Sequence, residues 1–168
     1  MSDDYLKVIR GGLNSTFQDE GRKGMYHIGL PFSGVMDKRN YLIANKLNNN
    51  NKNDAVLEFA YQGPLLKYFG RKRNIVITGN VNFKILKTDK SLNNGECYRT
   101  IEINDGDTID IISTNKSVYG YLSINGGVNL EKDWGSFSTT IRAKVGPNNG
   151  QKLIDGQEIK LNEENLSQ

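Results

Sequence analysis

The sequence predicts a mostly β protein, built as a barrel or as a sandwich of two sheets. The chain has 18 glycines and 3 prolines in 168 residues, and tight turns separate its short β-prone runs. The clearest strand candidates are 5–10, 75–78, 81–86, 108–112 and 118–124. Within 108–112, Ile109 and Ile111 share one face and their neighbours share the other, which is typical of a strand with one buried face. Seven or more short strands with few long connections favour a barrel or a sandwich.

One helix is expected, from residue 38 to about residue 47. Tyr41, Ala44 and Leu47 recur at three-residue spacing and give the segment an apolar face. The carboxylate of Asp37 can accept the unpaired amide hydrogens of the first turn. An asparagine-rich run at 48–53 ends the helix.

Composition and charge exclude several classes of function. The net charge of +3 is spread along the chain, and the densest basic run, 71–73, has no interleaved aromatic residues, so no nucleic-acid partner is expected. One cysteine and one histidine leave no disulfide and no metal motif. The acidic N-terminus is unlike a signal peptide, and no apolar run is long enough to span a bilayer. We therefore expect a soluble cytoplasmic protein, with residues 1–161 as one domain and 162–168 as a frayed polar tail.

The most unusual segment is a glycine-rich stretch at residues 16–37. Glycines at 21, 24, 29 and 34, with Pro31 between them, predict an irregular loop whose backbone amides can face a ligand. Arg22 offers a planar fork suited to a carboxylate or a phosphate. The polar side chains that this segment displays are Gln18, Asp19, Arg22, His27, Ser33 and Asp37. The segment lacks the spacing of a nucleotide-binding motif.

Each of these residues also has a structural interpretation. Asp19 and Arg22 can pair to lock the loop, Ser33 can be a turn residue, and His27 can be a structural hydrogen-bonding group. Glu58, a charge in the apolar run 56–59, is either a paired structural carboxylate or a catalytic group with a raised pKa. The glycine and hydroxyl residues at 124–128 and 135–139 are interpreted as tight turns, although they can also admit a ligand.

Several segments, taken in order, resemble one family. They are 16–19, Gly21-Arg22, Gly24, 26–29, 31–37, Ala44-Asn45, Leu57-Glu58, Gly63-Pro64, 77–79, Gly106-Asp107, Tyr121-Leu122, Gly126-Gly127, Gly135-Ser136 and Ser138-Thr139. From about Val8 to Leu161, the chain is similar to the N-terminal part of the C-type subunit of 5-oxoprolinase. This family is also called biotin-dependent carboxyltransferase and is related to allophanate hydrolase subunit 2 and urea amidolyase. Its members are about twice as long, so the resemblance does not imply activity for this chain alone.

This resemblance implies a cyclophilin-like β-barrel that works with a B-type partner subunit and possibly a third subunit. The implied activity is ATP-dependent opening of 5-oxoproline to glutamate, or carboxyl transfer to a related amide. The substrate would be a small amide or lactam, ATP would act in the assembled complex, and biotin would be needed only for carboxyl transfer. The alternatives are a non-catalytic regulatory or binding subunit, and a half-barrel that needs its other half to fold.

On this basis we expect an anionic group to be held by Arg22 and the Ser33-Gly34 backbone. Gln18, Asp19 and Asp37 would shape the pocket or handle protons. The expected catalytic residues are Gln18, Asp19, Arg22, His27 and Asp37, and the expected substrate-binding residues are Ser33, Gly34, Met36, Asn45 and Glu58.

Overall fold

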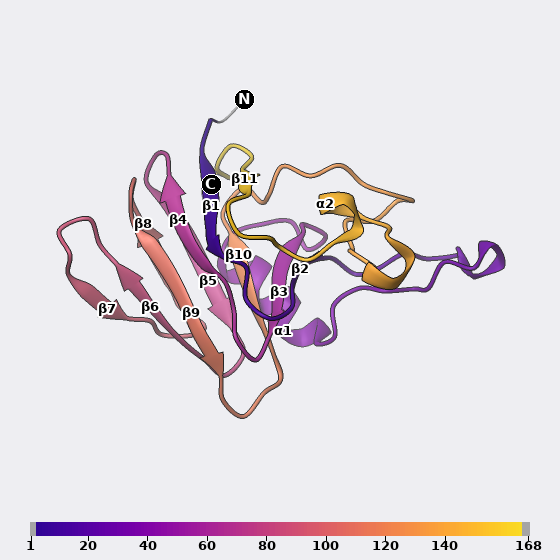
Figure 1. The fold of residues 1–168 in the computed structure, drawn as a ribbon, viewed down its shortest axis with the longest axis horizontal. Helices are drawn as coiled ribbons and strands as arrows, with labels where there is room; N and C mark the ends of the chain where they lie inside the picture. The colour runs from indigo at the N-terminus through magenta and orange to yellow at the C-terminus, as the bar shows by residue number, and fades with distance from the viewer. Residues whose placement is uncertain (1–2, 166–168) are drawn as a thin grey trace.

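The computed structural model describes residues 3–165, which form two antiparallel β-sheets and one regular α-helix (Figure 1). The first sheet has the strand order β11-β1-β4-β9-β6-β7. Its strands are β1 (Tyr5–Arg10), β4 (Leu65–Phe69), β6 (Val81–Leu86), β7 (Leu92–Asn94), β9 (Thr108–Thr114) and β11 (Glu158–Lys160). The second sheet has the order β2-β3-β10-β5-β8. Its strands are β2 (Ser15–Gln18), β3 (Val56–Ala60), β5 (Arg73–Thr78), β8 (Thr100–Ile103) and β10 (Tyr119–Ile124).

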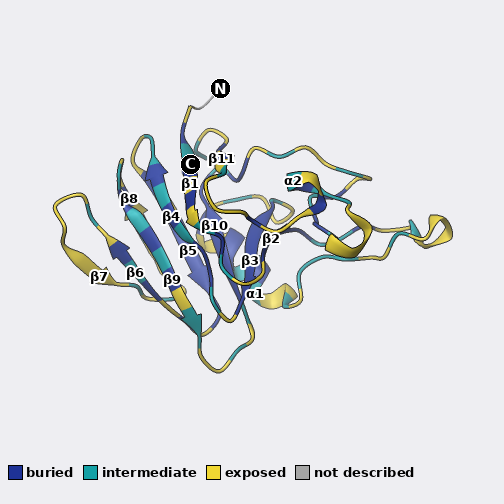
Figure 2. Ribbon diagram, viewed as in Figure 1, coloured by how far each residue is buried: buried dark blue, intermediate teal, exposed yellow. Residues whose placement is uncertain are grey.

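The hydrophobic core lies between the two sheets, and the buried strand faces stand out in Figure 2. On β9, Ile109 and Ile111 are buried while Ile112 is exposed, which confirms the predicted alternation. Leu57 and Phe59 on β3 point into the same core from the second sheet. Apolar burial of this kind is the main stabilising contribution to the fold.

Helix α1 (Lys38–Leu47) packs on the outer face of the second sheet. Tyr41 and Ala44 form a separate buried cluster there with Val56 of β3 and Tyr121 of β10. Asp37 caps the helix, because its Oδ1 accepts the backbone N–H of Asn40 at 3.1 Å. The short elements η1 (Tyr26–Ile28), η2 (Ile141–Ala143) and α2 (Pro147–Gly150) lie in the connections.

Two long connections extend from the sheets on the same side. The purple loop that follows β2 and the orange-to-yellow segment that carries α2 both extend to the right in Figure 1. They are bonded to each other, since the side chain of Ser138 donates to Asp19 at 2.7 Å and the guanidinium of Arg22 donates to the carbonyl of Asp133 at 3.0 Å. Together these connections build the region next to the outer face of the second sheet.

The mostly β class and the helix at 38–47 are confirmed, and so are the five predicted strands, within a few residues at their ends. The two sheets formed by residues 3–165 stay separate and do not close into a barrel. The predicted polar tail is held to the body as far as Asn165, whose N–H donates to the Asn125 side chain at 3.0 Å. Residues 166–168 lie outside the described part of the chain.

Candidate functional site

The outer face of the second sheet carries a row of polar side chains. Thr16 and Gln18 lie two residues apart on β2 and therefore share one face. Glu58 on β3 pairs across the strands with Thr16 on one side and with Tyr121 of β10 on the other. Because its neighbours Leu57 and Phe59 point into the core, the side chain of Glu58 points to this outer face.

A pocket of about 400 Å³ lies over this polar row. Its walls come from β2, β3 and β10, from the connection between β2 and α1, and from residues 139–142. The lining residues are Asn14, Thr16, Gln18, Pro31, Ser33, Gly34, Met36, Glu58, Tyr119, Thr139, Thr140, Ile141 and Arg142. Its volume lies within the range of pockets that take small molecules, roughly 300–1,000 Å³.

One wall of the pocket belongs to the glycine loop, which we define as residues 19–36. Backbone N–H groups join its two arms, that of Arg22 donating to Phe32 at 2.6 Å and that of Val35 to Asp19 at 3.0 Å. Gly34 permits this approach, because its φ is +106° and a Cβ there would lie 2.8 Å from the carbonyl oxygen of Glu20. The place of Ser33 in the pocket wall therefore depends on a glycine at position 34.

The carboxylate of Asp19 anchors the glycine loop to the residues that follow Gly135. Its Oδ1 accepts from the N–H of Gly21 at 2.8 Å and from the hydroxyls of Ser136 and Ser138 at 2.6 and 2.7 Å. Its Oδ2 accepts from the N–H of Phe137 at 2.8 Å. A buried carboxylate with four donors is well satisfied, and this one fixes two distant segments of the chain beside the pocket.

The guanidinium of Arg22 lies directly behind the pocket wall and is only 1% exposed. Its Nε donates to the carbonyl of Asp133 at 3.0 Å, and its Nη1 donates to the hydroxyls of Ser33 at 3.0 Å and Thr140 at 3.4 Å. Its Nη2 is buried and has no hydrogen-bond partner within residues 3–165. Burial lowers the pKa of Arg22, and the charges of Asp133 and Asp19 oppose this effect. The guanidinium thus hydrogen-bonds only to neutral oxygens, while the carboxylates of Asp133 and Asp19 act on its charge without bonding to it and its Nη2 stays unused.

Glu58 is 8% exposed and lies in the pocket wall. Its Oε2 accepts from the N–H of Met36 at 2.8 Å and from the hydroxyl of Tyr121 at 2.7 Å, while its Oε1 accepts no hydrogen bond from the described residues. Burial raises the pKa of the carboxyl group, although both hydrogen bonds act in the opposite direction. Burial and the nearby Glu58 carboxylate also raise the pKa of Tyr121. The pair therefore keeps its protons to a higher pH than exposed groups would.

Comparison with known proteins identifies the family. The sequence profile described as carboxyltransferase domain, subdomain A and B, matches residues 28–168. The chain belongs to this family. The resemblance predicted from the sequence is thereby confirmed.

Named relatives of this carboxyltransferase domain are of two kinds. It is 31% identical to a urea amidolyase of Saccharomyces cerevisiae over 165 residues, which cover 96% of this chain and 9% of that protein. It is 28% identical to the C-type subunit of 5-oxoprolinase from Escherichia coli over 156 residues, which cover 93% of this chain and 49% of that protein. The chain therefore spans about half of the oxoprolinase subunit and a small part of the amidolyase.

A solved structure with the same fold is the crystal structure of the K. lactis urea amidolyase. The two match with a TM-score of 0.87 and 30% sequence identity, over 95% of this chain and 9% of that one. This match agrees with the two-sheet architecture described above.

The carboxyltransferase domain brings half of the ten predicted site residues to one pocket. Those that line it are Gln18, Ser33, Gly34, Met36 and Glu58. Arg22 reaches it through its bonds to Ser33 and Thr140, and Asp19 holds the loop in place.

The remaining three predicted residues do not line the pocket either. His27 is exposed in η1, in the glycine loop, and Asp37 caps α1. Asn45 is buried in α1, where its Nδ2 donates to the carbonyl of Asp54 at 2.9 Å and its Oδ1 accepts from Ser123 at 3.1 Å. Their functional roles remain predictions.

The sequence did not indicate residues 140–142 as part of the site, and it gave 139 only the alternative of admitting a ligand. Thr139 ends the run of small hydroxyl residues that we interpreted as turns, Thr140 follows it, and Arg142 lies in η2. The signal available was that run itself, because Ser136 and Ser138 are the partners of Asp19 more than 110 residues away.

Residues 3–165 hold no metal centre of the usual composition. They contain no group of three or more histidine, cysteine, aspartate or glutamate side chains placed to bind a metal ion. No helix in the same range is both long enough and apolar enough to cross a membrane.

Proposed function

We propose that this chain is the pocket-bearing part of a subunit of an ATP-dependent 5-oxoprolinase, which opens 5-oxoproline to glutamate, or of a related amide carboxyltransferase or hydrolase. The names of its relatives support this assignment, and so does the small polar pocket. Its partner would be a B-type subunit, with a third subunit possible, and the cytoplasm is the expected compartment.

The observation that carries the proposal is the buried charge of Arg22. Its guanidinium hydrogen-bonds only to neutral oxygens and leaves Nη2 unused, and the charges of Asp133 and Asp19 offset its burial only in part, so a further negative charge beside it would be favourable. The opening of an amide or lactam places negative charge on the carbonyl oxygen. Fixed donors that already face this position stabilise such a charge without having to reorganise.

Arg142 favours an anionic substrate. It is an exposed cation that lines the pocket, so a carboxylate bound next to it would gain charge-assisted hydrogen bonds. The substrate 5-oxoproline carries a carboxylate beside its lactam, whereas urea is neutral. The pocket therefore favours 5-oxoproline of the two substrate classes.

Glu58 is the group best placed to handle a proton. Its raised pKa brings protonation closer to neutral pH, and its Oε1 accepts no hydrogen bond within residues 3–165. We assign it the exchange of a proton with the bound substrate.

ATP and biotin are assigned outside this pocket. The lining combines one arginine with one carboxylate, Glu58, and so does not match a polyphosphate. ATP would act in the assembled complex, and biotin would take part only if the reaction is a carboxyl transfer.

The test uses the full-length protein assembled with its partner subunit, and follows 5-oxoproline-dependent ATP hydrolysis. Arg142→Ala should raise the KM for 5-oxoproline roughly 10-fold or more, because a charged hydrogen bond contributes about 1.5–3 kcal/mol. Arg99→Ala is the matched control, since its side chain is 71% exposed and does not line the pocket.

Equal KM values for the two variants would remove Arg142 from the site. A complex that assembles but turns over no 5-oxoproline would contradict the proposal and favour the non-catalytic alternative.

A further inference from the structure

The side-chain amide of Gln18 has a fixed orientation. Its Nε2 donates to the hydroxyl of Thr16 and to the carbonyl of Thr139, both at 2.9 Å. A carbonyl can only accept, so the Thr139 contact decides which end of the amide is nitrogen. The Oε1 of Gln18 is then left buried, without a partner in the described part of the chain. Gln18 is 5% exposed and lines the pocket, so the side chain that carries this unused acceptor is part of the pocket wall.

The hydroxyls of Ser33 and Thr140 have the opposite character. Each accepts a hydrogen bond from Nη1 of Arg22, which has no acceptor to offer in return. Neither hydroxyl donates to any acceptor within residues 3–165, and both residues line the pocket. Their hydrogens are therefore free to donate to a ligand.

The backbone of Ser33 supports this interpretation. Its φ is +48°, in the left-handed region that residues other than glycine seldom adopt. Such strained positions are concentrated at ligand-binding sites. Here the conformation accompanies the contact between the Ser33 hydroxyl and Arg22.

We propose that these three side chains recognise one amide group of the substrate. The substrate N–H donates to Oε1 of Gln18, and its C=O accepts from the hydroxyls of Ser33 and Thr140, with the Arg22 charge behind them. This inference rests on the proposed function and deepens it. It makes Gln18 the residue that selects a lactam over the corresponding lactone.

The experiment is a calorimetric titration of the full-length protein in complex with its partner subunit. The two probes are 5-oxoproline and the matching lactone acid, in which a ring oxygen replaces the N–H. The wild-type protein should bind the lactam roughly 5- to 150-fold more tightly, because the lactone leaves the buried acceptor unpaired. Comparable affinities would overturn the role of Gln18 and leave the proposed function intact. If neither probe binds, both the role of Gln18 and the proposed function are overturned.

Variants test separately the contact of the substrate N–H with Gln18 and the contact of its carbonyl with Ser33 and Thr140. Gln18→Met removes the acceptor and should reduce the ratio of lactam to lactone affinity to near one, whereas Gln151→Met, at an exposed position outside the pocket, should keep the wild-type ratio. The double variant Ser33→Ala, Thr140→Val should weaken both probes by a similar factor, because both contain the carbonyl. Unchanged affinities in that variant would overturn the proposal that the hydroxyls of Ser33 and Thr140 donate to the substrate carbonyl. If Gln18→Met does not fold, the ratio of lactam to lactone affinity in the wild-type protein still tests whether Gln18 accepts from the substrate N–H.

Discussion

At the level of single residues, the burial of Glu58 makes the stability of the protein depend on pH. Its pKa is raised from the ordinary 4.5, so the folded state holds the proton more tightly than the unfolded state does. The stabilising contribution of this group is therefore complete below about pH 4.5 and is lost as the pH rises through the raised pKa.

Glu58→Gln should remove this dependence, because the neutral side chain can still accept from Met36 and Tyr121. The free energy of unfolding of the variant should exceed that of the wild type by a margin that grows with pH. Urea titrations from about pH 4 to about pH 8 measure this margin. The control is Glu96→Gln, at a side chain that is 77% exposed. A margin that stays constant, or that shrinks as the pH rises, would contradict the assigned pKa direction.

Single residues also mark the limit of what the sequence could predict about the site. Gln18, Ser33 and Gly34 were predicted because glycine spacing and polar side chains cluster locally. Thr140 and Arg142 were not, because they reach the pocket through contacts between segments over 100 residues apart. Asp19 and Arg22 do not form the ion pair that we considered. Their partners are Ser136, Ser138 and Asp133, which local sequence could not reveal.

At the level of elements, the glycine loop depends on close backbone contact rather than on positive φ alone. Gly34 and Gly29 both have positive φ, but a Cβ on Gly34 would meet the backbone of Glu20 and Gly21, whereas one on Gly29 would meet nothing within 4 Å. The two positions therefore separate conformational strain from steric overlap.

Gly29→Ala should lower the free energy of unfolding by about 1–2 kcal/mol, the cost of a left-handed conformation with a side chain. Gly34→Ala should cost about 1–3 kcal/mol more, because backbone atoms must also move. Denaturant titration of the full-length protein measures both. Gly34→Ala should also weaken 5-oxoproline binding, which Gly29→Ala should leave unchanged. Equal destabilisation by the two substitutions would exclude a tight contact at Gly34.

The elements were predictable where local pattern and burial agree. Strand β9 alternates, and α1 has both an apolar face and a capping residue, so both were found. Strand β3 is buried at all five positions and shows no alternation, because α1 and the pocket loops cover its outer face. Its burial depends on tertiary contacts that no local pattern contains.

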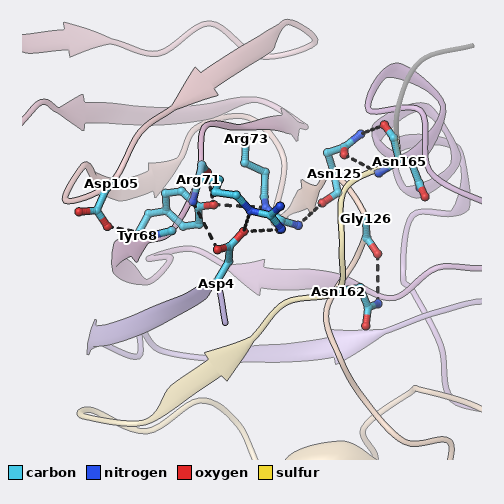
Figure 3. A network of polar contacts seen from close by, with 10 residues as sticks. Asp4, Tyr68, Arg71, Arg73, Asp105, Asn125, Gly126, Asn162 and Asn165 are labelled. Carbon is cyan, nitrogen blue, oxygen red and sulfur yellow. Dashed lines mark hydrogen bonds and ion pairs between the residues drawn. The ribbon is translucent and has the colours of Figure 1, made fainter. Parts of the chain in front are cut away.

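At the level of the whole molecule, a buried polar network connects strands from both sheets to the end of the described chain (Figure 3). Nη2 of Arg73 on β5 pairs with Asp4, just before β1, at 2.8 Å, and its Nη1 donates to the carbonyl of Asn125 at 2.6 Å. Asn125 in turn bonds to Asn165. The predicted polar tail is thus part of the fold as far as residue 165.

Asp4→Asn keeps the shape of this network but leaves the Arg73 charge buried without its partner. It should lower the free energy of unfolding by about 3 kcal/mol, as expected when a buried ion pair is broken. Glu102→Gln is the matched control, because its pair with Lys72 is exposed to solvent and should contribute little to stability. Equal losses in urea titrations of the two variants would show that the Asp4 pair contributes no more than a surface pair.

In the proposed function, the pocket between β2, the glycine loop and residues 139–142 binds a small anionic amide. The most direct measurement is a crystal structure of the full-length protein, assembled with its partner subunit and grown with 5-oxoproline. We predict the ligand in this pocket, with its carbonyl oxygen at hydrogen-bonding distance from Ser33 and Thr140, its N–H on Gln18 and its carboxylate next to Arg142. Ligand density elsewhere in the complex, with this pocket holding only water, would contradict the account.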